Sequence, residues 1–215
     1  AIFRSTECDR AVVNVGGIAN VTLLPADPAQ PVTGFDSGPG NCLMDAWARE
    51  QLGEPYDRAG RFAAAGRPDE ALLSRLLADP YFSAPPPKST GTDYFSPDWL
   101  KRQLPKPPPA AADVQATLSA LTAQSIARAI EQALPGSKEV LVCGGGAHNP
   151  VLMAMLEEAL QRQVRSTAAL GMDPEWVEAA AFAWLAQRTL VGLPGNLPEV
   201  TGARGPRILG AIYPA

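Results

Sequence analysis

The sequence predicts an α/β fold in which a mixed β-sheet is flanked by helices. Three short apolar runs open the chain, and further along stretches of helical periodicity alternate with short strand-like runs. Residues 139–143 are apolar on both faces, which is typical of a strand buried in a partly parallel sheet. Three successive strands followed by alternating helices and strands indicate a mixed sheet covered by helices.

Composition and charge narrow the class of protein. The 215 residues are 46% apolar and 19% charged, an ordinary globular composition with enough chain to bury a core. A net charge of −4 without a basic stripe argues against binding to nucleic acid or to an anionic membrane. Three distant cysteines fit reduced thiols, the single histidine excludes a zinc pattern, and no apolar run reaches membrane-spanning length. We therefore interpret the chain as a soluble cytoplasmic protein.

The first forty residues are predicted to form three strands. Residues 11–15 and 21–24 are β-branched or aliphatic runs joined by a glycine-rich connection of the hairpin kind. Residues 32–35 form the third strand, which we expect to end at Asp36. The glycine loop that follows leads into a helix for which Asn41 is the candidate cap.

The next part of the chain is predicted to be helical but interrupted. Residues 62–65 and 70–78 have helical periodicity, and a proline-bearing loop over residues 80–87 follows them. Ser96 precedes a proline and an apolar pair, a pattern that indicates a capped helical turn.

The longest helix is expected over residues 114–134, with Asp113 as its cap and a Pro-Gly pair as its end. After the strand at 139–143 and three glycines, Asn149 is predicted to cap a helix that begins at Pro150. The remaining expected elements are a short strand near Val164, a helix over residues 174–191 and a last strand over residues 207–213.

Three consecutive glycines stand between the 139–143 strand and the helix after it. Gly144, Gly145 and Gly146 would let the backbone lie flat against a nucleotide, because no Cβ intervenes. A tight turn that merely needs positive φ is the alternative. Gly16 and Gly17, taken alone, favour an ordinary hairpin turn.

Asp36 is the acidic residue whose position most indicates a catalytic role. It follows an apolar strand and precedes a glycine loop, where a carboxylate can accept a proton or organise a metal and phosphate; a turn aspartate is the alternative. Asp45 is read as a solvated or packing carboxylate, and His148 as a surface residue. Glu178 opens an apolar helix as either a helix-dipole partner or a ligand contact.

Two further features carry weaker predictions. The segment of residues 88–91 could contact a phosphate, but it lacks a complete Walker pattern and its proline flank favours a positioning role. The four tryptophans are predicted to be core or rim aromatics; they are Trp47, Trp99, Trp176 and Trp184.

Six motifs, taken together and in order, resemble one family. They are VNVGGIAN at 13–20, GFDSGPGN at 34–41, PKSTG at 87–91, GGGAHN at 144–149, WVEA at 176–179, and LPGNLP at 193–198 with VTGA at 200–203. They resemble the motifs of the anhydro-N-acetylmuramic acid kinases, which belong with sugar kinases, actin and heat-shock chaperones. The resemblance implies a ribonuclease-H-like (actin-like ATPase) domain, ATP and Mg²⁺ as cofactors, and a role in cell-wall murein recycling.

The same resemblance assigns roles to individual residues. It implies that Asp36 is the general base that activates water to open the 1,6-anhydro ring, and that Glu178 helps to hold the sugar. Its nucleotide-binding residues would be Gly16 and Gly17 in a phosphate-binding hairpin, with Gly144, Gly145, Gly146 and Asn149 in the adenosine loop. No protein ligand for a metal is predicted.

The family's Gly-Thr-Ser-x-Asp-Gly phosphate motif has no counterpart in these residues. We therefore expect residues 1–215 to be the C-terminal kinase domain of a longer protein, with little activity alone. The resemblance also implies a homodimer of the full-length protein. Two alternatives stay open, a non-catalytic actin-like nucleotide-binding module and a kinase of another sugar.

Overall fold

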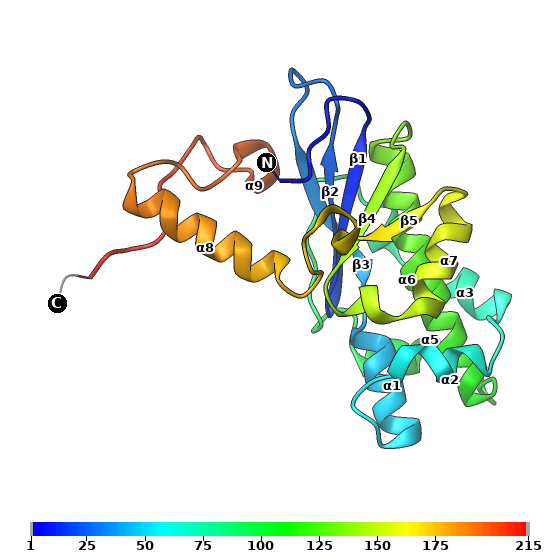
Figure 1. The fold of residues 1–215 in the computed structure, drawn as a ribbon. Helices are drawn as coiled ribbons and strands as arrows, with labels where there is room; N and C mark the ends of the chain where they lie inside the picture. The colour runs from blue at the N-terminus through cyan, green and yellow to red at the C-terminus, as the bar shows by residue number, and fades with distance from the viewer. Residues whose placement is uncertain (1, 214–215) are drawn as a thin grey trace.

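The computed structural model describes residues 2–213, and its centre is a five-stranded mixed sheet (Figure 1). The strands are ordered β3-β2-β1-β4-β5. Their bounds are Arg10–Val15 for β1, Ile18–Leu24 for β2, Thr33–Pro39 for β3, Glu139–Cys143 for β4 and Val164–Ser166 for β5.

Strand directions follow from how the strands are connected. β1 and β2 form an antiparallel hairpin with Val13 opposite Val21, and β2 pairs antiparallel with β3. β4 lies parallel to β1 and to β5, as expected for strands reached through helical crossovers. This order and these directions are those of a ribonuclease-H-like sheet, so the predicted fold class is confirmed.

One face of the sheet carries the hydrophobic core. Alternate strand residues such as Val13, Val21 and Phe35 pack there against the longest helix, α6 (Ala111–Ala133). The other helices of this layer are α1 (Cys42–Leu52), α2 (Arg61–Ala64), α3 (Glu70–Leu77), α4 (Pro80–Ser83), α5 (Pro97–Gln103) and α7 (Pro150–Leu160). The residues between these face the other side, which carries polar side chains beside a second, smaller cluster of buried apolar residues that includes Val12 and Leu141.

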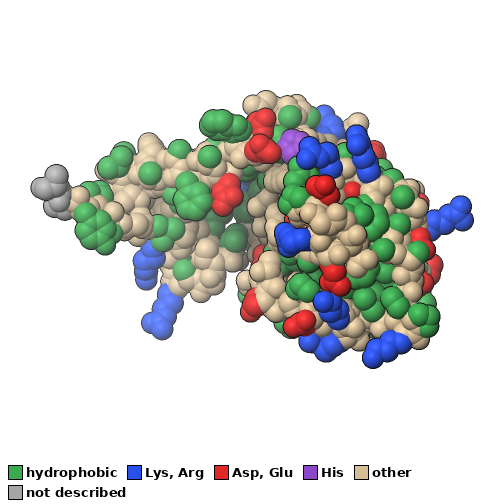
Figure 2. All heavy atoms as spheres, turned by 90° about the horizontal axis from the view of Figure 1, so that it is seen from below, with side chains coloured by type: hydrophobic (Ala, Val, Ile, Leu, Met, Phe, Trp, Pro, Cys, Tyr) green, Lys and Arg blue, Asp and Glu red, His purple; other side chains and the backbone are tan. Residues whose placement is uncertain are grey.

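The C-terminal part leaves the sheet. Helix α8 (Val177–Leu190) projects from the body, and the segment after it, which contains α9 (Pro198–Thr201), runs back beside it (Figure 1). No residue of α8 is buried, and the side chain of Phe182 is 64% exposed. Figure 2 shows this arm as a separate lobe with many apolar side chains on its surface.

Several expectations about elements are wrong, among them the loop predicted over residues 80–87, where a short helix, α4, forms. No strand forms over residues 207–213 in the described part of the chain, because that segment runs beside the arm and not along a sheet edge. Helix α6 begins at Ala111 and not at 114, so Asp113 lies in its first turn instead of capping it. Helix α8 begins at Val177, after a turn where a helical start at 174 was expected.

The tryptophan prediction holds for only two of the four. Trp47 and Trp99 are buried in the core, whereas Trp176 and Trp184 are 66% and 46% exposed on the arm. The three cysteines are free, as predicted. None of the helices that the structure describes combines the length and apolar character needed to span a membrane.

Candidate functional site

Polar side chains gather on the open face of the sheet, on the side away from α6. The alternation of β1, β2 and β3 places Asn14, Asn20, Thr22 and Asp36 there. A cleft of about 520 Å³ lies over Asn14, Asn20 and Thr22, and a hollow of about 280 Å³ lies at Asp36. Asn20 and Thr22 line both, so the two spaces adjoin.

Asp36 lies within β3, where the sequence suggested that the strand had ended. The strand continues to Pro39 because a register shift at Ala19 and Asn20 lets β2 follow it past the aspartate. Asp36 pairs with Asn20 in the sheet, and its side chain is half-buried at the hollow. The carboxylate therefore borders open space and does not point into packed hydrocarbon.

Neighbouring loop residues hold the carboxylate of Asp36. Its Oδ2 accepts hydrogen bonds from the Thr90 backbone N–H at 2.9 Å and from Ser89 Oγ at 3.1 Å. Its Oδ1 has no hydrogen-bond partner among residues 2–213. One oxygen is thus fixed, and the other remains available to a ligand.

The Gly16-Gly17 turn rests against the start of α1. The Gly16 carbonyl accepts from the Asn41 N–H at 2.8 Å, and the Gly17 carbonyl accepts from the Gly40 and Cys42 N–H groups at 2.9 and 3.1 Å. Asn41 occupies the N-cap position but makes no capping bond; its Nδ2 donates to the Val15 carbonyl instead. The hairpin turn and the helix start therefore form one rigid unit at the end of the sheet.

The three glycines after β4 have different environments. A Cβ on Gly144 would meet Asn14 Oδ1 at 2.4 Å, and one on Gly146 would meet Val15 Cγ1 at 2.4 Å. Gly145 is exposed, and a Cβ there would meet only Asn41 Nδ2, at an ordinary 3.6 Å. Close packing on β1 therefore accounts for Gly144 and Gly146, whereas Gly145 faces open space.

A second cleft lies on the other side of Gly145. It has a volume of about 570 Å³ and is lined by Asp45, His148 and Asn149 among others. Burial raises the pKa of Asp45 to about 6; Arg49 opposes this shift, and Asp57 adds to it. Asp45 is thus a partly buried acid rather than a solvated one.

Asn149 and His148 have structural partners in this cleft. Asn149 Oδ1 accepts from the Val151 and Leu152 N–H groups, both at 3.1 Å, which caps α7 as predicted. His148 is exposed and lies 3.4 Å from Glu175, in agreement with a surface position.

Glu178 lies in the first turn of α8 and lines the 520 Å³ cleft with Glu175. Burial raises the pKa of the neighbouring Cys143 thiol to about 11, and the charge of Glu178 adds to the shift. The cleft lining includes two carboxylates and no lysine or arginine. An anionic ligand there needs positive charge from a metal ion or from residues beyond this lining.

The structure brings most of the predicted site residues together. Gly16, Gly144, Gly145 and Glu178 line one cleft, Asp36 lies in the hollow beside it, and Asn149 lies across Gly145. The sequence did not predict the hydrogen bonds of Ser89 and Thr90 to Asp36. The proline-flanked segment at 88–91 was the available signal, but only the fold shows which carboxylate it reaches.

Mg²⁺ needs oxygen ligands, and it usually takes one or two carboxylates together with substrate phosphates and water. No group of three metal-binding side chains occurs in the described part of the chain. Asn14, Asn20, Asp36 and Glu178 nevertheless give this face an oxygen-rich lining. The donor set therefore fits a magnesium ion held mainly by phosphates.

Comparison with known proteins gives a consistent result. A family model described as anhydro-N-acetylmuramic acid kinase matches residues 1–215. The chain is 56% identical to the anhydro-N-acetylmuramic acid kinase of Bordetella petrii over 211 residues, 96% of this chain and 55% of the relative. It is 52% identical to that of Xylella fastidiosa over 216 residues, 100% of this chain and 56% of the relative.

The chain thus spans about half the length of the curated relatives it matches. Among solved structures it is similar to the activator of the 2-hydroxyisocaproyl-CoA dehydratase from Clostridium difficile with bound ADPNP. That likeness has a TM-score of 0.49 and 14% identity, and it covers 81% of this chain and 62% of the activator.

Proposed function

The chain belongs to the anhydro-N-acetylmuramic acid kinase family, and on that premise we propose that it is the C-terminal domain of an ATP-dependent kinase. The enzyme opens the 1,6-anhydro ring of anhydro-N-acetylmuramic acid and phosphorylates the freed 6-oxygen, in cytoplasmic murein recycling. The family name and the high identity to its members support this activity, and the share of the relatives' length that is matched supports a longer protein.

Asp36 is the general base in this proposal. The observation that carries it is the arrangement of its carboxylate: Oδ2 is fixed by Thr90 and Ser89, Oδ1 has no hydrogen-bond partner among residues 2–213, and Asp36 lines the hollow next to the larger cleft. Oδ1 takes a proton from water as the water oxygen bonds to the anomeric carbon. The bond from that carbon to the 6-oxygen breaks, and the 6-oxygen attacks the γ-phosphorus of ATP, releasing ADP.

The sugar lies over the open face, between Asp36 and Glu178. Both carboxylates border adjoining spaces that share Asn20 and Thr22, so one small ligand can reach both. Carboxylate and amide oxygens accept hydrogen bonds from sugar hydroxyls, which supports Glu178 as a sugar ligand.

The nucleotide lies along the glycine turns. Gly145 separates the two large clefts and has no Cβ to block either, which supports adenosine contact there. The Gly16-Gly17 turn, fixed on α1, would hold phosphate groups, and Asn149 lies at the far cleft. A bound Mg²⁺ would neutralise phosphate charge, for which the carboxylate-lined cleft supplies no cation.

The reaction is tested with the full-length kinase in ¹⁸O-labelled water. We expect sugar-dependent ADP formation, with the label in the anomeric hydroxyl and the phosphate on the 6-oxygen. ADP formation without sugar dependence would instead indicate a nucleotide-binding module, and label-free product would exclude attack by water.

The 215-residue chain alone is expected to turn over less than about a thousandth as fast as the full-length kinase, because its 520 Å³ cleft has no lysine or arginine in its lining to position a phosphate. A rate equal to that of the full-length kinase would overturn the two-part proposal. We also propose that the full-length kinase is a homodimer, which its mass in solution would test.

A further inference from the structure

Asp36 lies on an edge strand, and a single segment outside the sheet holds it. β3 is at the edge of the sheet, so backbone groups on its outer side face no further strand. Residues 81–90 form this segment and supply the missing partners of β3. The Asp36 N–H donates to the Lys88 carbonyl at 3.2 Å, and Tyr81 Oη donates to the Asp36 carbonyl at 2.7 Å. Both the N–H and the carbonyl of Asp36 are therefore held from the outer side of the edge strand.

The same segment fixes one oxygen of the side chain. Ser89 Oγ and the Thr90 N–H both donate to Oδ2, and hydrogen bonds to an ionised acceptor are the stronger kind. Ser89 is exposed, so its hydroxyl has no packing role. Four hydrogen bonds thus determine the position and rotation of a single carboxylate.

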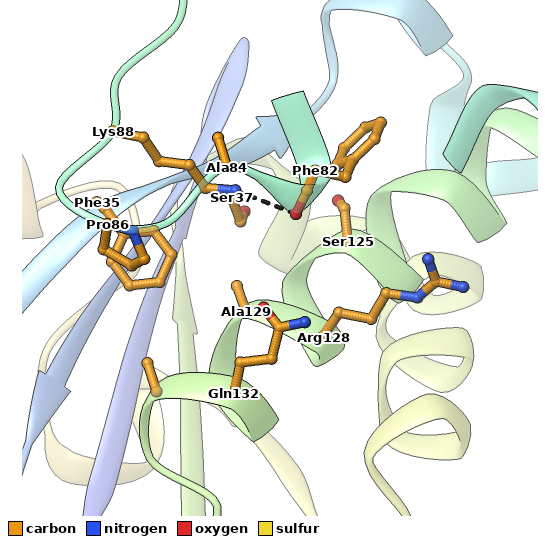
Figure 3. Close-up of a pocket in the computed structure, with 11 residues that line it drawn as sticks. Phe35, Ser37, Phe82, Ala84, Pro86, Lys88, Ser125, Arg128, Ala129 and Gln132 are labelled. Atoms are coloured by element: carbon orange, nitrogen blue, oxygen red, sulfur yellow. Dashed lines mark hydrogen bonds between the residues drawn. The ribbon is translucent and has the colours of Figure 1, made fainter. Parts of the chain in front are cut away.

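The side chain of Lys88 lies on the opposite face of β3, where Figure 3 shows its hydrogen bond to Phe82. Its Nζ donates to the carbonyls of Tyr81 and Phe82, at 3.0 and 3.4 Å, and lies 4.7 Å from the centre of the Tyr81 ring. The ring packs edge-on against buried Phe95 at 5.4 Å. Lys88 therefore links the loop that holds the carboxylate to the helix that carries Tyr81.

We propose that Tyr81, Ser89 and the Thr90 amide form a clamp that presents Oδ1 of Asp36 to the attacking water, which makes Tyr81 and Ser89 positioning residues. A base must lie within hydrogen-bond reach of the proton it removes, and small displacements are costly in rate. Burial, with a further contribution from Asp36, raises the pKa of the Tyr81 hydroxyl above its usual range, so it remains a donor. The clamp rests on the proposed role of Asp36 as the base.

The test compares Ser89→Ala and Tyr81→Phe in the full-length kinase. Each removes one hydrogen bond to Asp36 and keeps the rest of the side chain, so we expect kcat to fall about tenfold with KM for the sugar within about twofold. Ser89→Thr keeps the hydroxyl and restores kcat. Ser83→Ala is the matched control, because Ser83 is exposed and its Oγ donates only to the Pro80 carbonyl.

A second readout needs no turnover. Amide hydrogen exchange in the 215-residue chain should be slow at Thr90 and should accelerate about tenfold or more in Asp36→Ala, because the amide loses its acceptor. Unchanged exchange at Thr90 in the Asp36→Ala variant of the 215-residue chain would overturn the clamp. This readout does not depend on whether the variant folds in the full-length kinase.

The results for these variants distinguish a failure of the clamp from a failure of the proposed role of Asp36 as the base. If Asp36→Asn is inactive but Ser89→Ala and Tyr81→Phe behave as Ser83→Ala does, the clamp is wrong and the base assignment stands. A rise in KM with unchanged kcat would make Ser89 a sugar contact and also overturns the clamp. Wild-type turnover by Asp36→Asn would overturn the base assignment and the clamp together.

Discussion

At the scale of single residues, small atomic distances decide which members of the site are structural and which face a ligand. Gly144 has φ of +76°, and its missing Cβ would lie 2.4 Å from Asn14 Oδ1, whereas Gly145 has room for a methyl group. Two adjacent glycines of one motif thus have different reasons to be glycine. The motif alone could not separate them, because both positions read as the same letter.

The pair Gly144→Ala and Gly145→Ala tests this difference. Gly144→Ala should lower the free energy of unfolding by about 1–2 kcal/mol or more, from the left-handed backbone and the clash. Gly145→Ala should change it by less than about 0.5 kcal/mol but weaken nucleotide binding severalfold. Urea unfolding and nucleotide titration measure both. Equal stability losses in the two variants would contradict the assignment.

Asp45 gives a pH-dependent prediction. Burial raises the pKa of Asp45 to about 6 in the folded chain, above its ordinary value of about 4. The folded state therefore binds this proton more tightly, and the wild type loses stability as the pH rises from about 4 to 6.

Asp45→Asn removes this proton linkage. Because the group is only half-buried, we expect the variant to gain about 1 kcal/mol over the wild type at pH 7 relative to pH 4. Urea unfolding at the two pH values measures the difference. The same difference at both pH values would show that Asp45 titrates normally in the folded chain.

At the scale of secondary-structure elements, the sequence predicts most of the core. The apolar runs of β1, β2 and β4 and the periodicity of α6 identify those elements, because burial imposes their patterns. The predicted end of β3 at Asp36 was wrong because the Gly38-Pro39 pair reads as a turn. Pairing with β2 extends the strand through it, and a proline is tolerated there because β3 is an edge strand.

Helix α8 illustrates a limit of pattern reading. Its apolar sequence indicates a packed helix, yet none of its residues is buried in the described chain. Likewise, the apolar residues between 207 and 213 suggested a strand, but no strand of the sheet lies next to them. Periodicity reports which side chains favour burial and does not report what surface is present to bury them.

The contrast between core and arm can be measured with one substitution at two sites. Phe95 is 1% exposed and packs against Tyr81 and Trp99, so Phe95→Ala should cost about 3–5 kcal/mol of unfolding free energy. Phe182 is 64% exposed on α8, so Phe182→Ala should cost less than about 0.5 kcal/mol in the 215-residue chain. A loss above about 2 kcal/mol for Phe182→Ala would show that α8 is packed in solution.

At the scale of the whole molecule, one face of the sheet is covered by helices, and the other face carries the candidate site. Helices pack on the side of Val13 and Phe35, and the 520 Å³ cleft, Asp36 and Glu178 lie on the other side. The chain spans about half the length of its curated relatives, and the larger cleft has two carboxylates and no lysine or arginine in its lining; on our proposal further residues of the full-length kinase complete this site. The site residues were predicted by resemblance, whereas their adjacency required the strand order.

The most direct test of the account is Asp36→Asn in the full-length kinase, with turnover and nucleotide affinity measured on the same protein. Loss of a general base should lower kcat at least a hundredfold, while the dissociation constant for ATP should stay within about twofold. That result would support Asp36 as the base that activates water. Turnover near the wild-type rate, or loss of ATP binding with it, would contradict the account.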